Sequence, residues 1–123
     1  MGALRNIKVL DLSRILAGPY STQILSDLGA EIWKVESPWG DDTRQWGPPF
    51  LNKESSYYLS ANRGKKSLII NLKSEKGQNI IKDLAKKADI LVENFKVGNL
   101  AKFGLDYQSL SEINPKLIYA SVT

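Results

Sequence analysis

Residues 8–35, KVLDLSRILAGPYSTQILSDLGAEIWKV, form the stretch that decides the fold. Two short apolar runs, at residues 8–12 and 31–35, are typical of buried strands. Between them, the apolar side chains of residues 20–28 recur at the spacing of one helix face, after a proline and before a glycine. A strand, a helix and a second strand in this order predict a right-handed βαβ unit, whose two strands run parallel.

The same alternation continues to the end of the sequence. Further apolar runs of strand length occupy residues 67–71, 89–93 and 117–121. Residues 75–88 carry an apolar stripe at helical spacing, with Ser74 as the N-cap. We therefore expect an α/β fold in one domain, residues 1–123, built as a Rossmann-like parallel sheet flanked by helices.

One connection breaks this rhythm. Residues 37–63 contain three prolines and two tryptophans, and they predict at most a short helix at residues 55–60. Loops of this length are uncommon inside compact domains and are often functional. Two further short helices are expected, at residues 98–103 and 109–113.

Composition excludes several kinds of chemistry. The 123 residues include no cysteine and no histidine, which excludes disulfides, thiolate nucleophiles, histidine bases and Cys/His metal sites. Catalysis would have to use carboxylates, hydroxyls, lysines or backbone amides. The net charge of +4 suits an anionic partner, and the basic residues are dispersed rather than gathered in a stripe. A phosphorylated cofactor therefore fits this chain better than a nucleic acid does.

The sequence contains no recognisable targeting or membrane segment. No apolar run approaches the roughly 18 residues that a membrane span needs. The first five residues, MGALR, have neither an apolar signal core nor an Arg/Ser-rich amphipathic pattern. We expect a cytoplasmic protein that does not bind membranes.

The common motifs for phosphate and metal binding are also absent. No G-x-G-x-x-G follows the first strand, and Gly64-Lys65 cannot end a P-loop, because Leu59 stands where that loop needs a glycine. The adjacent carboxylates Asp41 and Asp42 lack the spacing of a calcium loop, so we expect no metal there. The basic cluster at residues 62–67 is consistent with a solvated face or with a phosphate contact.

Two segments lie at the carboxyl ends of predicted strands, where open α/β sheets bind ligands. Residues 14–19, RILAGP, would let an anion approach the amides of the next helix, or would form a simple tight turn. Asn94 and Phe95 could receive an adenine ring by hydrogen bonding and stacking. Alternatively, Phe95 belongs to the core and Asn94 caps the turn.

Eight short motifs occur together in a fixed order. They are VLDL at 9–12, LAGP at 16–19, DLGA at 27–30, KVE at 34–36, GDDTR at 40–44, NRGKKS at 62–67, VENF at 92–95 and NPKLIY at 114–119. Together they resemble the N-terminal part of the class III CoA-transferases, the CaiB/BaiF family, which includes formyl-CoA transferase and α-methylacyl-CoA racemase. Residues 40–50 and 55–59 are more similar to succinate–hydroxymethylglutarate CoA-transferase than to the racemase.

The resemblance implies an enzyme that moves CoA between an acyl-CoA and a carboxylic acid through an aspartyl acyl intermediate. It also implies an interlocked homodimer of the full-length protein. The attacking aspartate of the family follows a glycine-rich stretch that would begin beyond Thr123. By this resemblance the chain is an incomplete N-terminal CoA-binding domain, which we expect to have no catalytic residue and no turnover by itself.

The resemblance also implies where coenzyme A binds, as the acyl-CoA substrate. Its contact positions fall on Ile15, Leu16, Ala17, Ile70, Asn71, Leu72, Lys73, Asn94, Phe95, Lys96 and Lys102. Leu16 replaces a glutamine that lies near the reacting centre of formyl-CoA transferase, which argues against formate or oxalate chemistry. Ser37 replaces a CoA-contacting arginine. We therefore expect Lys73, Lys96 and Lys102 to share the phosphates, on one side of the carboxyl edge of the sheet.

Three alternatives remain open at this point. An acyl-CoA racemase of the same family would rely on a downstream histidine and aspartate. A non-catalytic CoA- or nucleotide-binding module would work as it stands. A nucleic-acid binder is disfavoured, because no DNA- or RNA-binding motif accompanies the dispersed basic residues.

Overall fold

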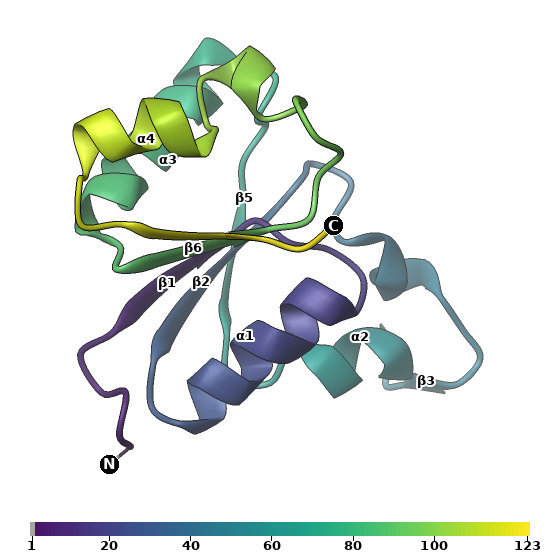
Figure 1. Cartoon of the computed structure of the whole chain (residues 1–123). Helices are drawn as coiled ribbons and strands as arrows, with labels where there is room; N and C mark the ends of the chain where they lie inside the picture. The colour runs from purple at the N-terminus through teal and green to yellow at the C-terminus, as the bar shows by residue number, and fades with distance from the viewer. Residues whose placement is uncertain (1) are drawn as a thin grey trace.

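A parallel sheet of five strands forms the centre of the molecule, as the computed structural model of residues 2–123 shows (Figure 1). Its strands are β1 (Lys8–Asp11), β2 (Glu31–Glu36), β5 (Lys66–Ile69), β6 (Ile90–Glu93) and β7 (Ile118–Ser121). They lie in the order β5-β2-β1-β6-β7. In the register of the sheet, Leu10 of β1 pairs with Trp33 of β2 on one side and with Leu91 of β6 on the other. The predicted α/β fold is confirmed.

Helices cover both faces of this sheet. Helix α1 (Ala17–Asp27) lies on one face, and α3 (Glu75–Lys87) and α4 (Tyr107–Ile113) lie on the other (Figure 1). Because successive strand residues point to opposite faces, Val9 packs in the core on one side and Leu10 in the core on the other. This two-sided burial explains why the strands are continuous apolar runs rather than alternating ones.

The strand order fixes the place where a ligand can enter. From β1 the chain moves outward through β2 to β5, and it then crosses to the other side of β1 to form β6 and β7. The connections leave the carboxyl ends of β1 and β6 in opposite directions, which opens a crevice at this switch point of the topology.

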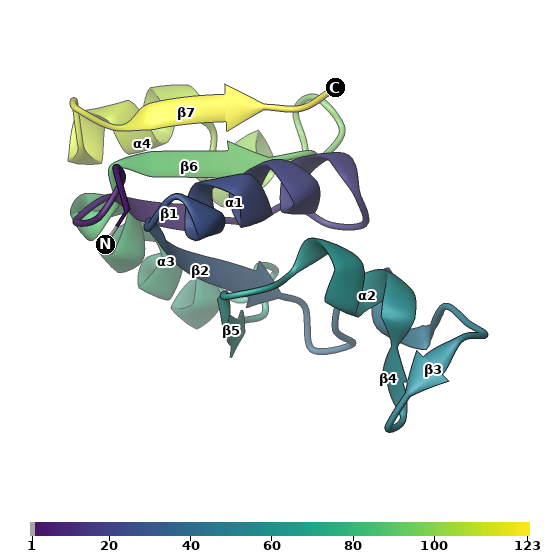
Figure 2. The same cartoon turned by 90° about the horizontal axis from the view of Figure 1, so that it is seen from below.

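The long connection between β2 and β5 is more ordered than the sequence indicates. It contains the 3₁₀ turn η1 (Asp42–Gln45), the hairpin strands β3 (Phe50–Leu51) and β4 (Glu54–Ser55), and α2 (Ser56–Ala61). The hairpin projects from the body of the molecule (Figure 2). Its two-residue turn places Asn52 and Lys53 at φ values of 49° and 69°, as a type I′ turn requires. The short helix predicted here is confirmed.

Some predicted boundaries shift. Strand β5 ends at Ile69, so Ile70 and Asn71 lie in the loop beyond it rather than in the strand. The helix predicted at residues 98–103 is only the 3₁₀ turn η2 (Ala101–Phe103). The shift at β5 matters for function, because it moves two predicted site residues to the carboxyl edge of the sheet.

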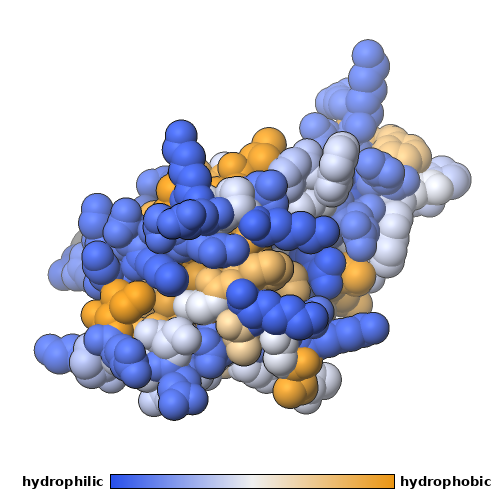
Figure 3. All heavy atoms as spheres, turned by 90° about the horizontal axis from the view of Figure 1, so that it is seen from above, coloured by the Kyte–Doolittle hydropathy of each residue, from blue (hydrophilic) through white to orange (hydrophobic). Residues whose placement is uncertain are grey.

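The outer surface on the side of α3 and α4 is mostly hydrophilic, with apolar side chains in small separate patches (Figure 3). The exposed lysines Lys86 and Lys87 end α3 on this side, where they complement the helix dipole. None of the helices within residues 2–123 is long and apolar enough to cross a membrane.

Candidate functional site

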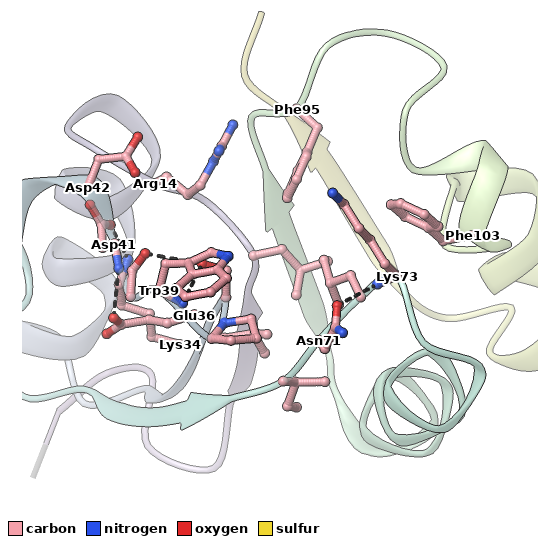
Figure 4. Close-up of a pocket in the computed structure, with 17 residues that line it drawn as sticks. Arg14, Lys34, Glu36, Trp39, Asp41, Asp42, Asn71, Lys73, Phe95 and Phe103 are labelled. Atoms are coloured by element: carbon pink, nitrogen blue, oxygen red, sulfur yellow. Dashed lines mark hydrogen bonds and ion pairs between the residues drawn. The ribbon is translucent and has the colours of Figure 1, made fainter.

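A cavity with a volume of about 510 Å³ opens at the carboxyl edge of the sheet (Figure 4). Its walls come from the ends of β1, β2, β5 and β6 and from η2. The lining residues are Leu12, Arg14, Lys34, Val35, Glu36, Ser37, Pro38, Trp39, Gly40, Asp41, Asp42, Ile70, Asn71, Leu72, Lys73, Phe95 and Phe103. This volume is within the range of about 300–1,000 Å³ that is usual for small-molecule sites.

Two exposed cations face this cavity. Arg14 follows β1, and Lys73 lies in the loop between β5 and α3. Neither side chain forms an ion pair with an acidic residue anywhere in the described chain. Figure 4 shows the guanidinium of Arg14 on one side of Phe95 and the ammonium of Lys73 on the other. Both cations are therefore available to an anionic ligand.

Aromatic and aliphatic side chains form the rest of the wall. Phe95 and Phe103 are partly buried, and Lys73 lies between them in Figure 4. Trp39 is 85% exposed at the rim, an unusual position for so large an apolar side chain. Flat apolar surfaces beside free cations suit a ligand that carries both an aromatic base and phosphates.

Glu36 anchors the back of the cavity. Its carboxylate accepts hydrogen bonds from Nε and Nη2 of Arg44, both at 2.7 Å, from the hydroxyls of Tyr58 and Ser67, and from the amide of Asp41. Burial alone would raise the pKa of Glu36, but these donors outweigh burial and lower the pKa to about 2. Arg44 is therefore paired locally with Glu36.

A buried ion pair lies beside Glu36. Lys34 Nζ donates to Asp41 Oδ2 at 2.9 Å, and both side chains are at most 1% exposed. Lys34 also donates to the carbonyl of Ser13 at 3.1 Å, and Asp41 accepts from the amide of Ile15 at 3.2 Å. The pair thus connects the end of β2 to the loop that follows β1.

A second buried pair lies on the α1 side of the sheet. Lys65 Nζ donates to Asp11 Oδ2 at 3.2 Å and to the carbonyl of Pro19 at 2.8 Å. Burial lowers the pKa of Lys65 to about 8, although Asp11 favours its charged form. The other cations of the basic cluster bind Asp27, through Arg63, and Glu31, through Lys66. Arg63 and Lys66 are exposed, as a solvated face requires, whereas Lys65 is buried and structural.

The structure brings together five of the residues predicted to bind CoA. These are Ile70, Asn71, Leu72, Lys73 and Phe95, which all line the large cavity.

The other six predicted residues do not line this cavity. Ile15, Leu16 and Ala17 lie in the loop after β1 and the start of α1, and Asn94 binds the backbone of that loop. Lys96 lines a smaller neighbouring cavity of about 180 Å³, and Lys102 lines neither of the two. The structure therefore does not gather the three predicted phosphate-binding lysines around one cavity.

Three parts of the wall were missed in the sequence. The side chains of Arg14 and Phe103 and the segment at residues 38–42 line the cavity without having been named as contact residues, although Arg14 belongs to the candidate segment at residues 14–19. Arg14 could have been found from its place directly after a buried strand. The segment at 38–42 could not, because its position depends on the buried contacts of Glu36 and Asp41.

Known proteins resemble this chain over nearly its whole length. Succinyl-CoA:glutarate CoA-transferase of Homo sapiens is 55% identical over 121 residues, which are 98% of this chain and 28% of that protein. Succinate–glutarate CoA-transferase of Agrobacterium fabrum is 50% identical over 127 residues, 98% of this chain and 32% of that protein. The crystal structure of a CAIB/BAIF family protein from Brucella suis matches with a TM-score of 0.96 and 50% identity, covering 99% of this chain and 33% of that one.

The chain therefore spans about a third of the length of these relatives and corresponds to their N-terminal part. The sequence pattern of CoA-transferase family III matches residues 4–123. The order of the strands, the cavity at their carboxyl edge and these matches agree, and this chain belongs to CoA-transferase family III.

Proposed function

We propose that this chain forms the CoA-binding part of an enzyme that transfers CoA from an acyl-CoA to a carboxylic acid. The observation that carries the proposal is the large cavity at the switch point of the sheet, where free cations and aromatic rings share one wall. Phosphates of CoA would approach Arg14 and Lys73, and the adenine ring would lie against Phe95 or Phe103.

The loop at Ile70–Lys73 holds four of the five predicted contact residues that line the cavity. Asn71 Oδ1 accepts from the amide of Lys73 at 3.0 Å, which fixes the turn that presents the lysine. Because Ile70 is buried while Lys73 is exposed, the loop offers an apolar floor and a charged rim. The contacts of Ile15, Leu16, Ala17, Asn94, Lys96 and Lys102 with CoA stay predictions of the resemblance.

The names of the relatives guide the choice of substrates. The human relative is named for succinyl-CoA and glutarate, and the bacterial one for succinate and glutarate. We propose the same class here: succinyl-CoA or a similar acyl-CoA as donor and a short dicarboxylate as acceptor. The transfer would proceed in a cytoplasmic, interlocked homodimer of the full-length protein.

The reacting carboxylate is proposed to lie outside this chain. In the proposed step, an aspartate beyond Thr123 attacks the thioester carbon, the carbon–sulfur bond breaks, and CoA leaves as the thiolate while the acyl group stays on the aspartate. The role of residues 1–123 is to bind and orient the CoA moiety. Their buried carboxylates Asp11, Glu36 and Asp41 are already fully used by hydrogen bonds and ion pairs.

A chimera tests this proposal directly. Residues 1–123 replace the matching part of the Agrobacterium relative, and new CoA esters are followed by mass spectrometry with succinyl-CoA and glutarate. We expect turnover by the chimera and none by the chain alone. Turnover by the chain alone would place a reacting group within residues 1–123, and a folded chimera that binds no CoA would refute the proposed role.

A further inference from the structure

Arg14 is exposed, yet both its side chain and its backbone make specific contacts with neighbouring residues. The centre of its guanidinium lies 4.8 Å from the centroid of the Phe95 ring, a cation–π contact. In the described chain no carboxylate lies within ion-pairing distance of it. A cation that stacks on a ring and lacks an acidic partner keeps its donors free for a ligand.

Asn94 binds the backbone of Arg14 from both sides. Its Oδ1 accepts from the Arg14 amide at 3.0 Å, and its Nδ2 donates to the Arg14 carbonyl at 2.7 Å. One N–H donor and one lone pair of the Asn94 side-chain amide are thereby used to hold the backbone of Arg14. Asn94 and Phe95 are consecutive, so the end of β6 fixes both the backbone and the side chain of Arg14.

The residues on either side of Arg14 are fixed as well. Lys34 donates a hydrogen bond to the carbonyl of Ser13, and Asp41 accepts one from the amide of Ile15. Ile15 has a φ of 75°, a rare conformation for a β-branched residue that persists only where the surroundings impose it. Three consecutive backbone units are thus bound by side chains from β2, from the loop after it and from the end of β6.

We propose that Arg14 is a fixed anion-binding residue of the cavity and that Asn94 is a positioning residue that acts through it. The anion is a phosphate or a carboxylate, the two acidic groups of the proposed substrates. The inference rests on the proposed function for the identity of the ligand, but the fixed cation is observed independently of it. It gives Asn94 a role in addition to the predicted contact with the adenine ring, which stays a prediction.

A double-mutant cycle tests the proposal in the 123-residue chain. Binding of CoA, inorganic pyrophosphate and glutarate is measured by titration for the parent chain, Arg14→Met, Asn94→Ala and the double variant. We expect Arg14→Met to weaken binding of CoA and of at least one of the two small anions roughly tenfold. Asn94→Ala should weaken binding in the parent background and have no further effect once Arg14 is gone. If Arg14→Met weakens the binding of pyrophosphate, the group that Arg14 binds is a phosphate. If it weakens the binding of glutarate, that group is a carboxylate.

Matched variants separate positioning from general damage. Lys116→Met removes one exposed cation before β7, at the opposite edge of the sheet, and should leave every affinity unchanged. Arg14→Lys keeps the charge but not the planar group, so an intermediate loss is expected. If Asn94→Ala does not fold, as judged by circular dichroism, Asn94→Ser takes its place in the cycle.

The outcomes distinguish the inference from the proposed function. Equal effects of Arg14→Met and Lys116→Met, or a loss from Asn94→Ala that persists without Arg14, would overturn the inference. If CoA still binds the parent chain tightly in that case, the proposed function stands. If the parent chain binds pyrophosphate through Arg14 but not CoA, the inference stands and the proposed function fails.

Discussion

At the scale of single residues, the site is shaped by charges that are buried and paired. Lys34 and Asp41 neutralise each other, and Glu36 is neutralised by Arg44. Removing one partner of such a pair is costly, because the other charge is left buried without compensation. These residues support the cavity from behind and leave the exposed Arg14 and Lys73 for a ligand.

Glu36 should make the stability of the protein depend on acid. Its pKa is about 2 in the folded protein and about 4.5 in the unfolded chain, so its stabilisation is complete above pH 4.5 and is lost as the pH falls toward 2. The shift corresponds to roughly 3 kcal/mol. Urea denaturation at several pH values should show a Glu36→Gln variant that is less stable at pH 7 by a similar amount.

The free energies of unfolding of the parent chain and of Glu36→Gln should converge as the pH approaches 2. Glu54→Gln is the matched control, because Glu54 is exposed and lies 3.8 Å from the same Arg44. It should change the free energy of unfolding by less than about 0.5 kcal/mol at any pH. A constant difference between Glu36→Gln and the parent from pH 7 to pH 2 would show that Glu36 is not the titrating group.

The burial and pairing of single charged residues were the features that the sequence predicted least well. Lys34 and Lys65 look like surface lysines in the sequence, yet their side chains are 0% and 2% exposed. Their partners, Asp41 and Asp11, come from separate segments that only the tertiary structure brings together. Ser74, in contrast, caps its helix as predicted, with Oγ accepting from the amide of Gly77 at 3.0 Å, because capping depends on neighbouring residues alone.

At the scale of elements, α3 packs closely against the loop at residues 70–73, which precedes it. The helix begins at Glu75, and its one glycine, Gly77, faces the backbone of that loop. A Cβ placed on Gly77 would lie 2.0 Å from the carbonyl oxygen of Asn71. The helix can approach the loop only because this position has no side chain.

Gly77→Ala should therefore destabilise the protein, against the helix propensities. In an unconstrained helix this change would stabilise by about 1 kcal/mol. Here we expect a loss of at least about 1 kcal/mol in the free energy of unfolding, because a backbone carbonyl has to move. Denaturation by urea measures both this variant and the control Asn79→Ala, an exposed site on the same helix where propensity alone should stabilise slightly. Stabilisation by both changes would disprove the close approach.

The strands and helices were predicted better than the connections between them. Five apolar runs correctly indicated the parallel strands. In β1, β2 and β6 the signal follows from burial on both faces, whereas the edge strands β5 and β7 are apolar but mostly exposed. The hairpin β3–β4 was missed, since each strand has two residues and its Asn52–Lys53 turn lacks the usual glycine. The end of β5 was placed two residues late, because Ile70 continues the apolar run and its amide still bonds to Glu36.

At the scale of the whole molecule, the order of the strands brings the site together. Arg14, Asn71 and Phe95 are far apart in the sequence but follow three parallel strands, whose carboxyl ends meet at one edge of the sheet. Sequence alone indicated this edge, since it follows from strand direction. It could not show which side chains at the edge remain free, because that depends on pairing within the folded chain.

The most direct test of CoA binding at this edge is to map it by NMR on the isotope-labelled chain. On titration with CoA, we expect the amide signals of Ile70–Lys73, Arg14, Phe95 and Phe103 to shift, because these residues line the cavity. Signals at the amino edge of the sheet, such as those of Asp89 and Lys116, should stay in place. Shifts confined to the amino edge, or no shifts at saturating CoA in a folded chain, would contradict the account.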